Sequence, residues 1–293
     1  MNSEELFSLR GEIFRVPSTN APVGVELALE HVLPCEDLLY HFTSLETGLE
    51  KILPNRTLRF APLVGTNDPL EFEDIIHVGI DLDLGDEGNE VLRQGDRVKM
   101  IRRQTLLACF CSEKIDPADP VTPFSKGWKR ARMWAQYANN HRGICCVFHK
   151  ERFEAAVESA LPNRWKPLKD FVGYREEYDL GAGILKSTTL RPGDAFKESA
   201  QARLAREAKA LLFSKFHDFR DEREWRMVLI PDEQTTASEH FVPVRDSLQA
   251  VILGAKFPDI YEAVVLGLAK CEVFRVDWFH GRAALRTLKR SAV

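Results

Sequence analysis

The fold is decided by the stretch Leu39-Tyr40-His41-Phe42-Thr43-Ser44-Leu45-Glu46, which continues as Thr47-Gly48-Leu49-Glu50-Lys51-Ile52-Leu53. Its first part predicts a short strand that ends in a histidine and a hydroxyl residue. Ser44 is a suitable N-cap, and the apolar residues that follow recur at helical spacing: Leu45, Leu49, Ile52 and Leu53. We therefore predict a strand that turns directly into an amphipathic helix. His41 then lies near a helix N-terminus, whose free N–H groups favour anionic ligands such as nucleotides.

The composition is that of an ordinary globular protein. The chain has 293 residues, of which 44% are hydrophobic and 29% charged, so disorder is not expected. The net charge of -4 excludes a global polycation for nucleic-acid binding but leaves local basic patches open. No apolar run is long enough to cross a bilayer, and the first residues do not resemble an export signal. We expect a cytoplasmic protein without a membrane partner.

Six cysteines raise the question of a metal site. Cys109-Phe110-Cys111 and Cys145-Cys146 could supply four zinc ligands. However, adjacent residues on a strand point to opposite faces, and the two-residue spacers typical of zinc sites are absent. We expect reduced cysteines buried in apolar strands and no bound metal.

The pattern of apolar runs predicts an α+β fold with split mixed or antiparallel sheets flanked by helices. Three parts are expected: an N-terminal extension at 1–35, a core at 36–258, and a C-terminal helix, strand and tail at 259–293, packed on the core. The predicted strands lie near 39–43, 58–61, 106–111, 144–148, 225–230, 241–244, 250–254 and 273–278. The predicted helices lie near 45–53, 133–138, 151–161, 194–216 and 259–268.

Four segments together resemble a widespread bacterial family, domain of unknown function 2971. They are Tyr40-His41-Phe42-Thr43-Ser44-Leu45, Asn67-Asp68-Pro69 with Glu71, Met133-Trp134-Ala135-Gln136-Tyr137 running on to Gly143, and Lys215 followed by Glu222-Arg223-Glu224-Trp225-Arg226. The resemblance covers roughly residues 38–256. The name of the family carries no chemistry.

A more distant resemblance does carry chemistry. A His-x-Thr strand followed at once by a helix, with a late glutamate that opens an apolar strand, is similar to the ADP-ribosyltransferase superfamily. The resemblance implies an ADP-ribosyltransferase-like core at 36–258 and a site of His, Tyr and Glu. His41 matches the first position and Glu224 the last. Tyr137 is the weakest match, and Tyr40, Phe42 or Phe60 are alternatives for the middle position.

That resemblance implies NAD as the substrate. Cleavage of the nicotinamide–ribose bond builds positive charge on the ribose, which a fixed carboxylate stabilises. Glu224 is the candidate catalytic residue, with Glu222 in reserve; in an extended chain the two point the same way. His41 and Thr43 would bind the nucleotide and Tyr137 would stack on nicotinamide. Arg59, Arg132 or Arg226 could pair with the pyrophosphate.

Three functions follow as hypotheses. The first is transfer of ADP-ribose to a nucleic acid or protein by a toxin or antiphage effector, with an antitoxin or defence-system partner. The second is a non-enzymatic sensor that binds nucleotide, nucleic acid or a phage protein, for which Lys129-Arg130-Ala131-Arg132 offers a basic patch. The third is a metal-dependent nuclease with Asp68, Glu71, Glu222 and Glu224 as ligands. Each residue also has a structural interpretation, such as core packing for Tyr137 or a surface charge ladder for 222–226.

Overall fold

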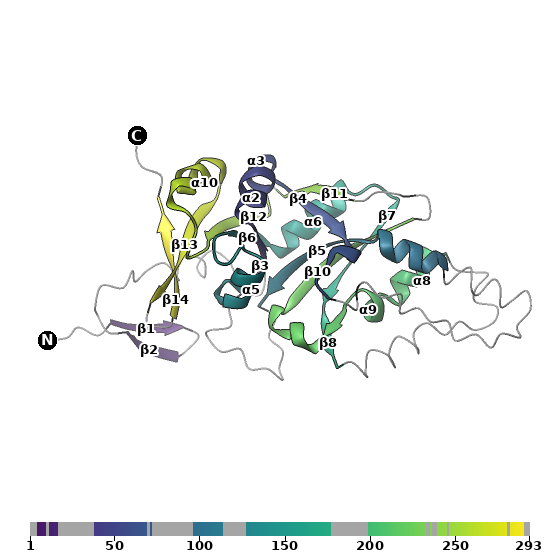
Figure 1. Ribbon diagram of the computed structural model, residues 1–293, viewed down its shortest axis with the longest axis horizontal. Helices are drawn as coiled ribbons and strands as arrows, with labels where there is room; N and C mark the ends of the chain where they lie inside the picture. Colours follow the sequence, from purple (N-terminus) through teal and green to yellow (C-terminus); the bar gives the residue numbers. More distant parts are fainter. Residues whose placement is uncertain are drawn as a thin grey trace, which may run out of the picture.

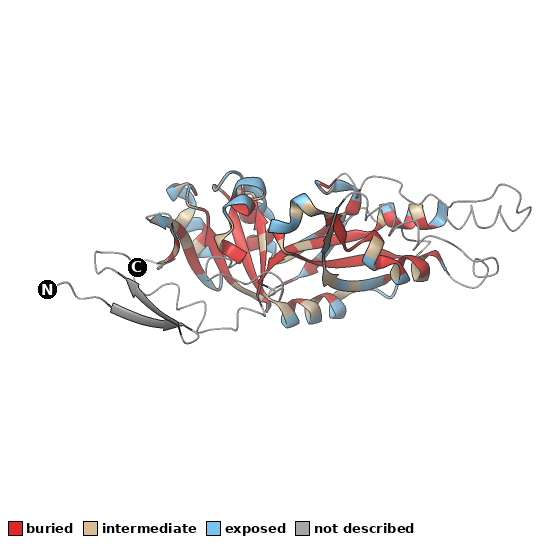
Figure 2. Cartoon of the chain, turned by 90° about the horizontal axis from the view of Figure 1, so that it is seen from below, coloured by how far each residue is buried: buried red, intermediate tan, exposed pale blue. Residues whose placement is uncertain are grey.

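The computed structural model describes residues 5–9, 12–16, 38–68, 71, 96–113, 127–176, 199–232, 235, 239–244, 246–279 and 282–289. These residues form a large, mostly antiparallel sheet flanked by helices (Figure 1). The expectation of helices packed on mixed or antiparallel sheets is confirmed at this level. Buried residues follow the strands along the length of the sheet, whereas the flanking helices carry the exposed ones (Figure 2).

Among the described residues, the main sheet has ten strands. Its principal order is β11 (His240–Pro243), β4 (Thr57–Pro62), β5 (Leu106–Ser112), β3 (Leu38–Thr43), β6 (Ile144–His149), β12 (Leu248–Leu253), β13 (Glu272–Phe279) and β14 (Arg282–Leu288). β10 (Glu224–Pro231) also pairs with β5 and with β7 (Trp165–Phe171). Only β12 and β13 pair in parallel within this sheet as described. Two smaller pairs are β1 (Glu5–Leu9) with β2 (Glu12–Val16), and β8 (Gly173–Arg175) with β9 (Ser214–Phe216).

The sheet forks at β5. β10 occupies one edge of β5 from Cys111 to Leu106. β3 and β4 share the other edge: β3 pairs with the end at Cys111 and Ser112, and β4 with the end at Leu106 and Leu107. Between them, residues 108–110 have no strand partner on that edge among the described residues. This gap is the feature of the fold that positions the candidate site.

One face of the sheet carries the largest apolar cluster, which includes Phe110, Phe148, Phe153 and Trp225. The predicted helix packs here, as α2 (Leu45–Thr47), the π-helix η2 (Gly48–Ile52) and α3 (Leu53–Asn55). The Ser44 side chain accepts a hydrogen bond from the Thr47 backbone N–H at 3.1 Å, so the predicted cap is confirmed. The other helices on this face are α6 (Lys150–Ala160), η7 (Asp259–Tyr261) and α10 (Glu262–Leu268).

The opposite face carries two apolar clusters. One surrounds Trp134 and Tyr40 and involves η5 (Gly127–Lys129) and α5 (Ala131–Gln136). The other surrounds Leu204 and Val228 and involves η3 (Leu63–Gly65), the helix at 96–104, α8 (Ala200–Arg206) and α9 (Ala208–Leu211). The candidate site lies on this face, around η6 (His217–Glu222) and the start of β10.

One predicted helix is wrong. The residues described between 199 and 216 do not form a single helix: α8 and α9 are followed by the strand β9. The Phe213 N–H bonds to the Ala208 carbonyl, which closes the helix, and residues 214–216 then pair with β8. The apolar spacing did not reveal where α9 ends, because the buried apolar residues continue past its last residue: Leu211, Leu212 and Phe213 are all buried. The sequence analysis also did not predict β7, β14 or the helix at 96–104.

Candidate functional site

The site begins with the alternation of β10. Trp225 points into the large apolar cluster, where its ring lies 5.7 Å from that of Phe110. Its neighbours Glu224 and Arg226 therefore point to the other face. They lie opposite Cys111 and Cys109 in the register with β5. Both charged side chains are buried there, with 4% and 0% of their surface exposed.

Lys215 joins two carboxylates. Its ammonium nitrogen lies 2.8 Å from Oε2 of Glu222 and 2.8 Å from Oε2 of Glu224. Lys215 comes from β9 and Glu222 from the end of η6, so the short turn between them folds the two side chains together. The left-handed backbone of Arg223 (φ 43°) then directs the chain into β10.

Arg226 extends the network. Its Nε donates to Oε1 of Glu224 at 2.5 Å, and its NH1 forms an ion pair with Glu71 and donates to the Leu212 carbonyl. A buried charge without partners would cost several kcal/mol, by order of magnitude. That cost is avoided here because the guanidinium of Arg226 forms ion pairs with the carboxylates of Glu224 and Glu71.

Tyr137 is the outer end of this network. It is the C-cap residue of α5, and its phenol donates to Oε1 of Glu222 at 2.6 Å. The exposed side-chain amide of Gln136 donates to the same phenol oxygen at 3.2 Å. Because Tyr137 is only half-buried, it is where a ligand could exchange hydrogen bonds with the buried carboxylates.

The segment 66–71 supplies three residues that the sequence analysis did not place in the leading site. Asn67 acts to lower the pKa of Tyr137 against burial and Glu222, which raise it; Asp68 accepts the Phe216 N–H at 3.1 Å, and Glu71 pairs with Arg226. In the sequence, this segment is one of the four that carry the family resemblance, and Asp68 and Glu71 are considered as metal ligands. The signal is three polar residues close together, Asn67, Asp68 and Glu71.

The charges shift the pKa values of the network. Burial opposes ionisation of Glu224, but Arg226 and Lys215 outweigh it and lower the pKa of Glu224. Burial also opposes the charged Lys215, yet Glu224 and Glu222 raise the pKa of Lys215. Burial and the nearby Glu222 charge raise the pKa of Tyr137, so its phenol stays protonated. Burial raises the pKa of Glu71, which the charge of Arg226 partly offsets.

His41 approaches the same point from the other face. Its Nδ1–H donates to the Cys109 carbonyl at 3.0 Å, within the gap between β3 and β4. Its ring packs against Phe110, and burial lowers its pKa, which favours the neutral imidazole. On the other face of the strand, the Cys109 thiol is among the groups that lower the pKa of Glu224, after Arg226 and Lys215. His41 and Glu224 thus both lie near Cys109, but they do not face each other across one cleft.

The other predicted site residues lie apart from the network. Thr43 is buried on β3, two residues from His41. Arg59 is exposed on β4 and pairs with Glu239 at 3.4 Å, and Arg132 donates to the Asp218 carbonyl. The alternative aromatic residues are engaged elsewhere: Tyr40 donates to Glu113, Phe42 packs on Trp134, and Phe60 stacks on Phe153.

No metal-binding group of histidine, cysteine and acidic residues occurs in the part of the chain that the structure describes. The ammonium of Lys215 and the guanidinium of Arg226 occupy the space between Glu71, Glu222 and Glu224. The adjacent Cys145 and Cys146 belong to apolar clusters on opposite faces of the sheet. The described helices also include none long and apolar enough to span a bilayer.

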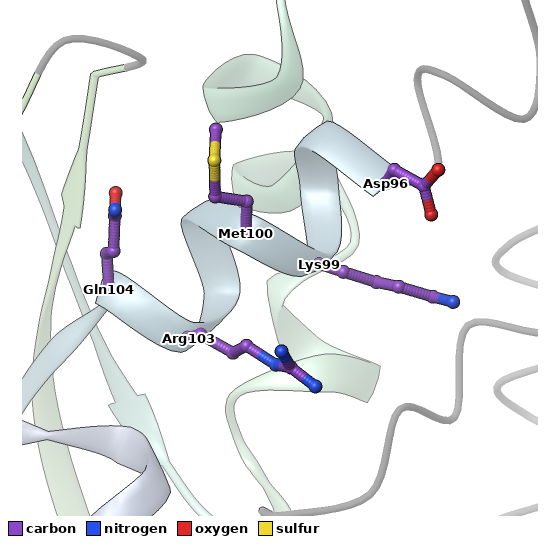
Figure 3. A pocket seen from close by; sticks show the side chains of 5 residues that line it. All are labelled: Asp96, Lys99, Met100, Arg103 and Gln104. Carbon is purple, nitrogen blue, oxygen red and sulfur yellow. The ribbon is translucent and has the colours of Figure 1, made fainter.

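A shallow hollow lies elsewhere, on the helix at 96–104 (Figure 3). It is lined by Asp96, Lys99, Met100, Arg103 and Gln104, which follow one side of the helix. It contains no residue of the network around Lys215. We therefore define the candidate site by its buried charges.

Comparison with known proteins gives one match. Residues 133–227 match the model of a family described as "Protein of unknown function (DUF2971)". The matched region contains Tyr137, Lys215, Glu222, Glu224 and Arg226, whereas His41 and the segment 66–71 lie outside it. No curated protein and no solved structure matches the chain.

Proposed function

We propose that this protein is an NAD-dependent ADP-ribosyltransferase-like protein whose nucleotide site lies at the fork of the sheet. The observation that supports this proposal is that His41 donates to the Cys109 carbonyl, while the start of β10, with Glu224, pairs with the same strand. The sequence resemblance places His41 and Glu224 in one site, although they are 183 positions apart along the chain. The acceptor is a nucleic acid or a protein, and the biological role is that of a toxin or antiphage effector.

Within this proposal Glu222 acts on the ribose and Glu224 supports it. Glu222 is bound by the half-buried Tyr137, whereas Glu224 is held between Lys215 and Arg226. A ribose hydroxyl would replace the Tyr137 phenol on Glu222. The bond between the ribose C1′ and the nicotinamide nitrogen breaks, and nicotinamide leaves as a neutral molecule. The acceptor nucleophile bonds to C1′, and its proton passes to the Glu222 carboxylate.

Nicotinamide release tests the proposal. The purified protein is incubated with NAD and with RNA, single-stranded DNA or a protein extract as acceptor. Glu222→Gln and Glu224→Gln are compared with Glu154→Gln, which removes a carboxylate that pairs with Lys169 far from the network. We expect wild type and Glu154→Gln to release nicotinamide, and each network variant to lose about 10²-fold or more. Release that is unchanged in both network variants, or absent with every acceptor, contradicts the proposal.

A second candidate is a non-enzymatic nucleotide- or nucleic-acid-binding module. The observation that favours it is that all four carboxylate oxygens of Glu222 and Glu224 already have partners. A binding module needs no free carboxylate. An increase in melting temperature with RNA or DNA, together with no increase and no nicotinamide release with NAD, would support this candidate over the transferase.

A further inference from the structure

Lys215 is a buried cation placed between two acids. It is 3% exposed, and its ammonium lies at the same distance, 2.8 Å, from Glu222 and from Glu224. The ring of Phe219 lies 5.1 Å from the ammonium and shields it on another side. Neither the family match nor the sequence resemblance assigns a role to this lysine.

Two buried carboxylates this close cannot both stay ionised without a cation, because each raises the free energy of the other's charged form. Arg226 contacts Glu224, but its guanidinium is shared with Glu71 and with the Leu212 carbonyl. Lys215 reaches both carboxylates at once. Its contact uses Oε2 of Glu222 and leaves Oε1 directed at Tyr137.

We propose that Lys215 is the positioning residue of this site: its ammonium holds Glu222 and Glu224 side by side as two anions and directs Glu222 toward Tyr137. The consequence for catalysis rests on the proposed function, in which an ionised Glu222 accepts a ribose hydroxyl and then a proton. The electrostatic arrangement itself does not depend on which ligand binds.

The surroundings of Lys215 support this role. The groups that face it are Glu222 on η6, Glu224 and Arg226 on β10, Cys109 on β5, Tyr137 after α5, Tyr174 on β8, and Glu71. Glu224 and Glu222 favour its charged form, whereas burial and Arg226 oppose it. The tyrosines and Cys109 remain neutral, because burial raises the pKa of each. Removing Lys215 therefore leaves Arg226 as the cation in direct contact with Glu224 and forces a proton onto the pair.

Carboxyl ¹³C NMR titration tests the proposal in the intact chain. Glutamate is labelled at Cδ, and the two signals are assigned by their loss in Glu222→Gln and Glu224→Gln. In wild type we expect the Glu224 signal to titrate below the ordinary range of glutamate, because Arg226 and Lys215 outweigh burial and lower its pKa. In Lys215→Met we expect one of the two signals to titrate about 1–3 units higher. Lys215→Arg keeps the charge and is expected to restore the wild-type curve.

Lys169→Met is the matched control. Lys169 also bridges two carboxylates, Glu154 at 2.7 Å and Glu158 at 3.2 Å, but on the exposed surface. Its removal should leave the titration of Glu222 and Glu224 unchanged. Identical curves for wild type and folded Lys215→Met would overturn the proposal. An effect of Lys169→Met as large as that of Lys215→Met would overturn it as well.

If Lys215→Met does not fold, the double variant Lys215→Met/Glu224→Gln decides. Removing one buried anion should then restore a cooperative thermal unfolding transition, and the absence of such a transition overturns the proposal. The nicotinamide assay is independent of this result. Absence of release from wild type refutes the transferase, while the titration still decides the role of Lys215. If wild type is active, Lys215→Met should lose at least tenfold at neutral pH, and the acid limb of its pH profile should move to higher pH.

Discussion

At the scale of single residues, four buried charged side chains form one network. Glu222, Glu224, Lys215 and Arg226 are each no more than 4% exposed, and each is paired. Replacing such pairs by apolar residues often stabilises a protein, so a buried network is weak evidence for stability alone. Its contact with the half-buried Tyr137 is what connects it to the surface.

Tyr137→Phe tests that connection. The variant keeps the ring but removes the hydroxyl that donates to Glu222 at 2.6 Å. A hydrogen bond to a charged group contributes about 1.5–3 kcal/mol, and we expect the free energy of unfolding to fall by that amount. Urea denaturation measures it. Tyr261→Phe, at an exposed tyrosine on η7, should change it by less than about 0.5 kcal/mol. Equal effects of the two substitutions would contradict the contact.

His41 predicts a pH dependence of stability. Burial lowers its folded-state pKa below the ordinary value of 6.5, so below that pH the unfolded chain binds more protons than the folded one. The free energy of unfolding should therefore fall as the pH is lowered through and below 6.5. In His41→Phe this component is removed and the slope becomes shallower. Burial also lowers the pKa values of His141 and His240. Both histidines are present in wild type and in His41→Phe, so their contributions cancel when the two stability curves are compared. Parallel stability curves for the two proteins would contradict a buried neutral His41.

At the scale of elements, the segment that connects α5 to β6 packs against the backbone of α5 and of β3. Asn139, Asn140 and His141 all have positive φ, which costs non-glycine residues strain that the surrounding bonds must hold. Those bonds include His141 N–H to the Trp134 carbonyl and Gly143 N–H to the Ala138 carbonyl. The connection therefore fixes Tyr137 relative to β6 and β3.

Gly143→Ala tests this packing. A Cβ at Gly143 would lie 2.2 Å from the Thr43 carbonyl oxygen and 2.9 Å from backbone atoms of Ala138. Backbone cannot move aside as a flexible side chain can, so we expect a loss of about 1–3 kcal/mol of stability. Gly65→Ala is the control, because no atom lies within 4 Å of a Cβ there. Thermal unfolding followed by circular dichroism distinguishes them, and a Gly143→Ala protein as stable as the control would refute the close approach.

The elements also show what the sequence could predict. Apolar alternation located most strands of the main sheet, and the Ser44 cap located the start of the helix after β3. Only part of the charge network was predicted. Glu222 and Glu224 were singled out, but the role of Lys215 depends on η6, the short 3-10 helix that turns the chain between β9 and β10 and has no apolar period. The contacts of the segment 66–71 depend on tertiary packing in the same way, since each partner is distant along the chain.

At the scale of the whole molecule, the fork of the sheet relates two sets of residues that the sequence keeps far apart. β3 and β4 diverge along one edge of β5, and His41 fills the gap by bonding to Cys109. The carboxylate network lies on the other face of the same strand. His41 and the carboxylates therefore lie on opposite faces of β5, and the proposed function needs an extended ligand such as a dinucleotide to contact both.

The most direct measurement of the central claim is an NMR titration of the full chain with NAD, followed through the imidazole signals of His41 and the ring signals of Tyr137. His41→Phe and Tyr137→Phe assign the two sets of signals. Under the proposed function we expect both sets of signals to shift along one saturation curve, because a single dinucleotide would contact both residues. Signals that stay unchanged at saturating NAD, or that shift for only one of the two residues, would contradict a shared site.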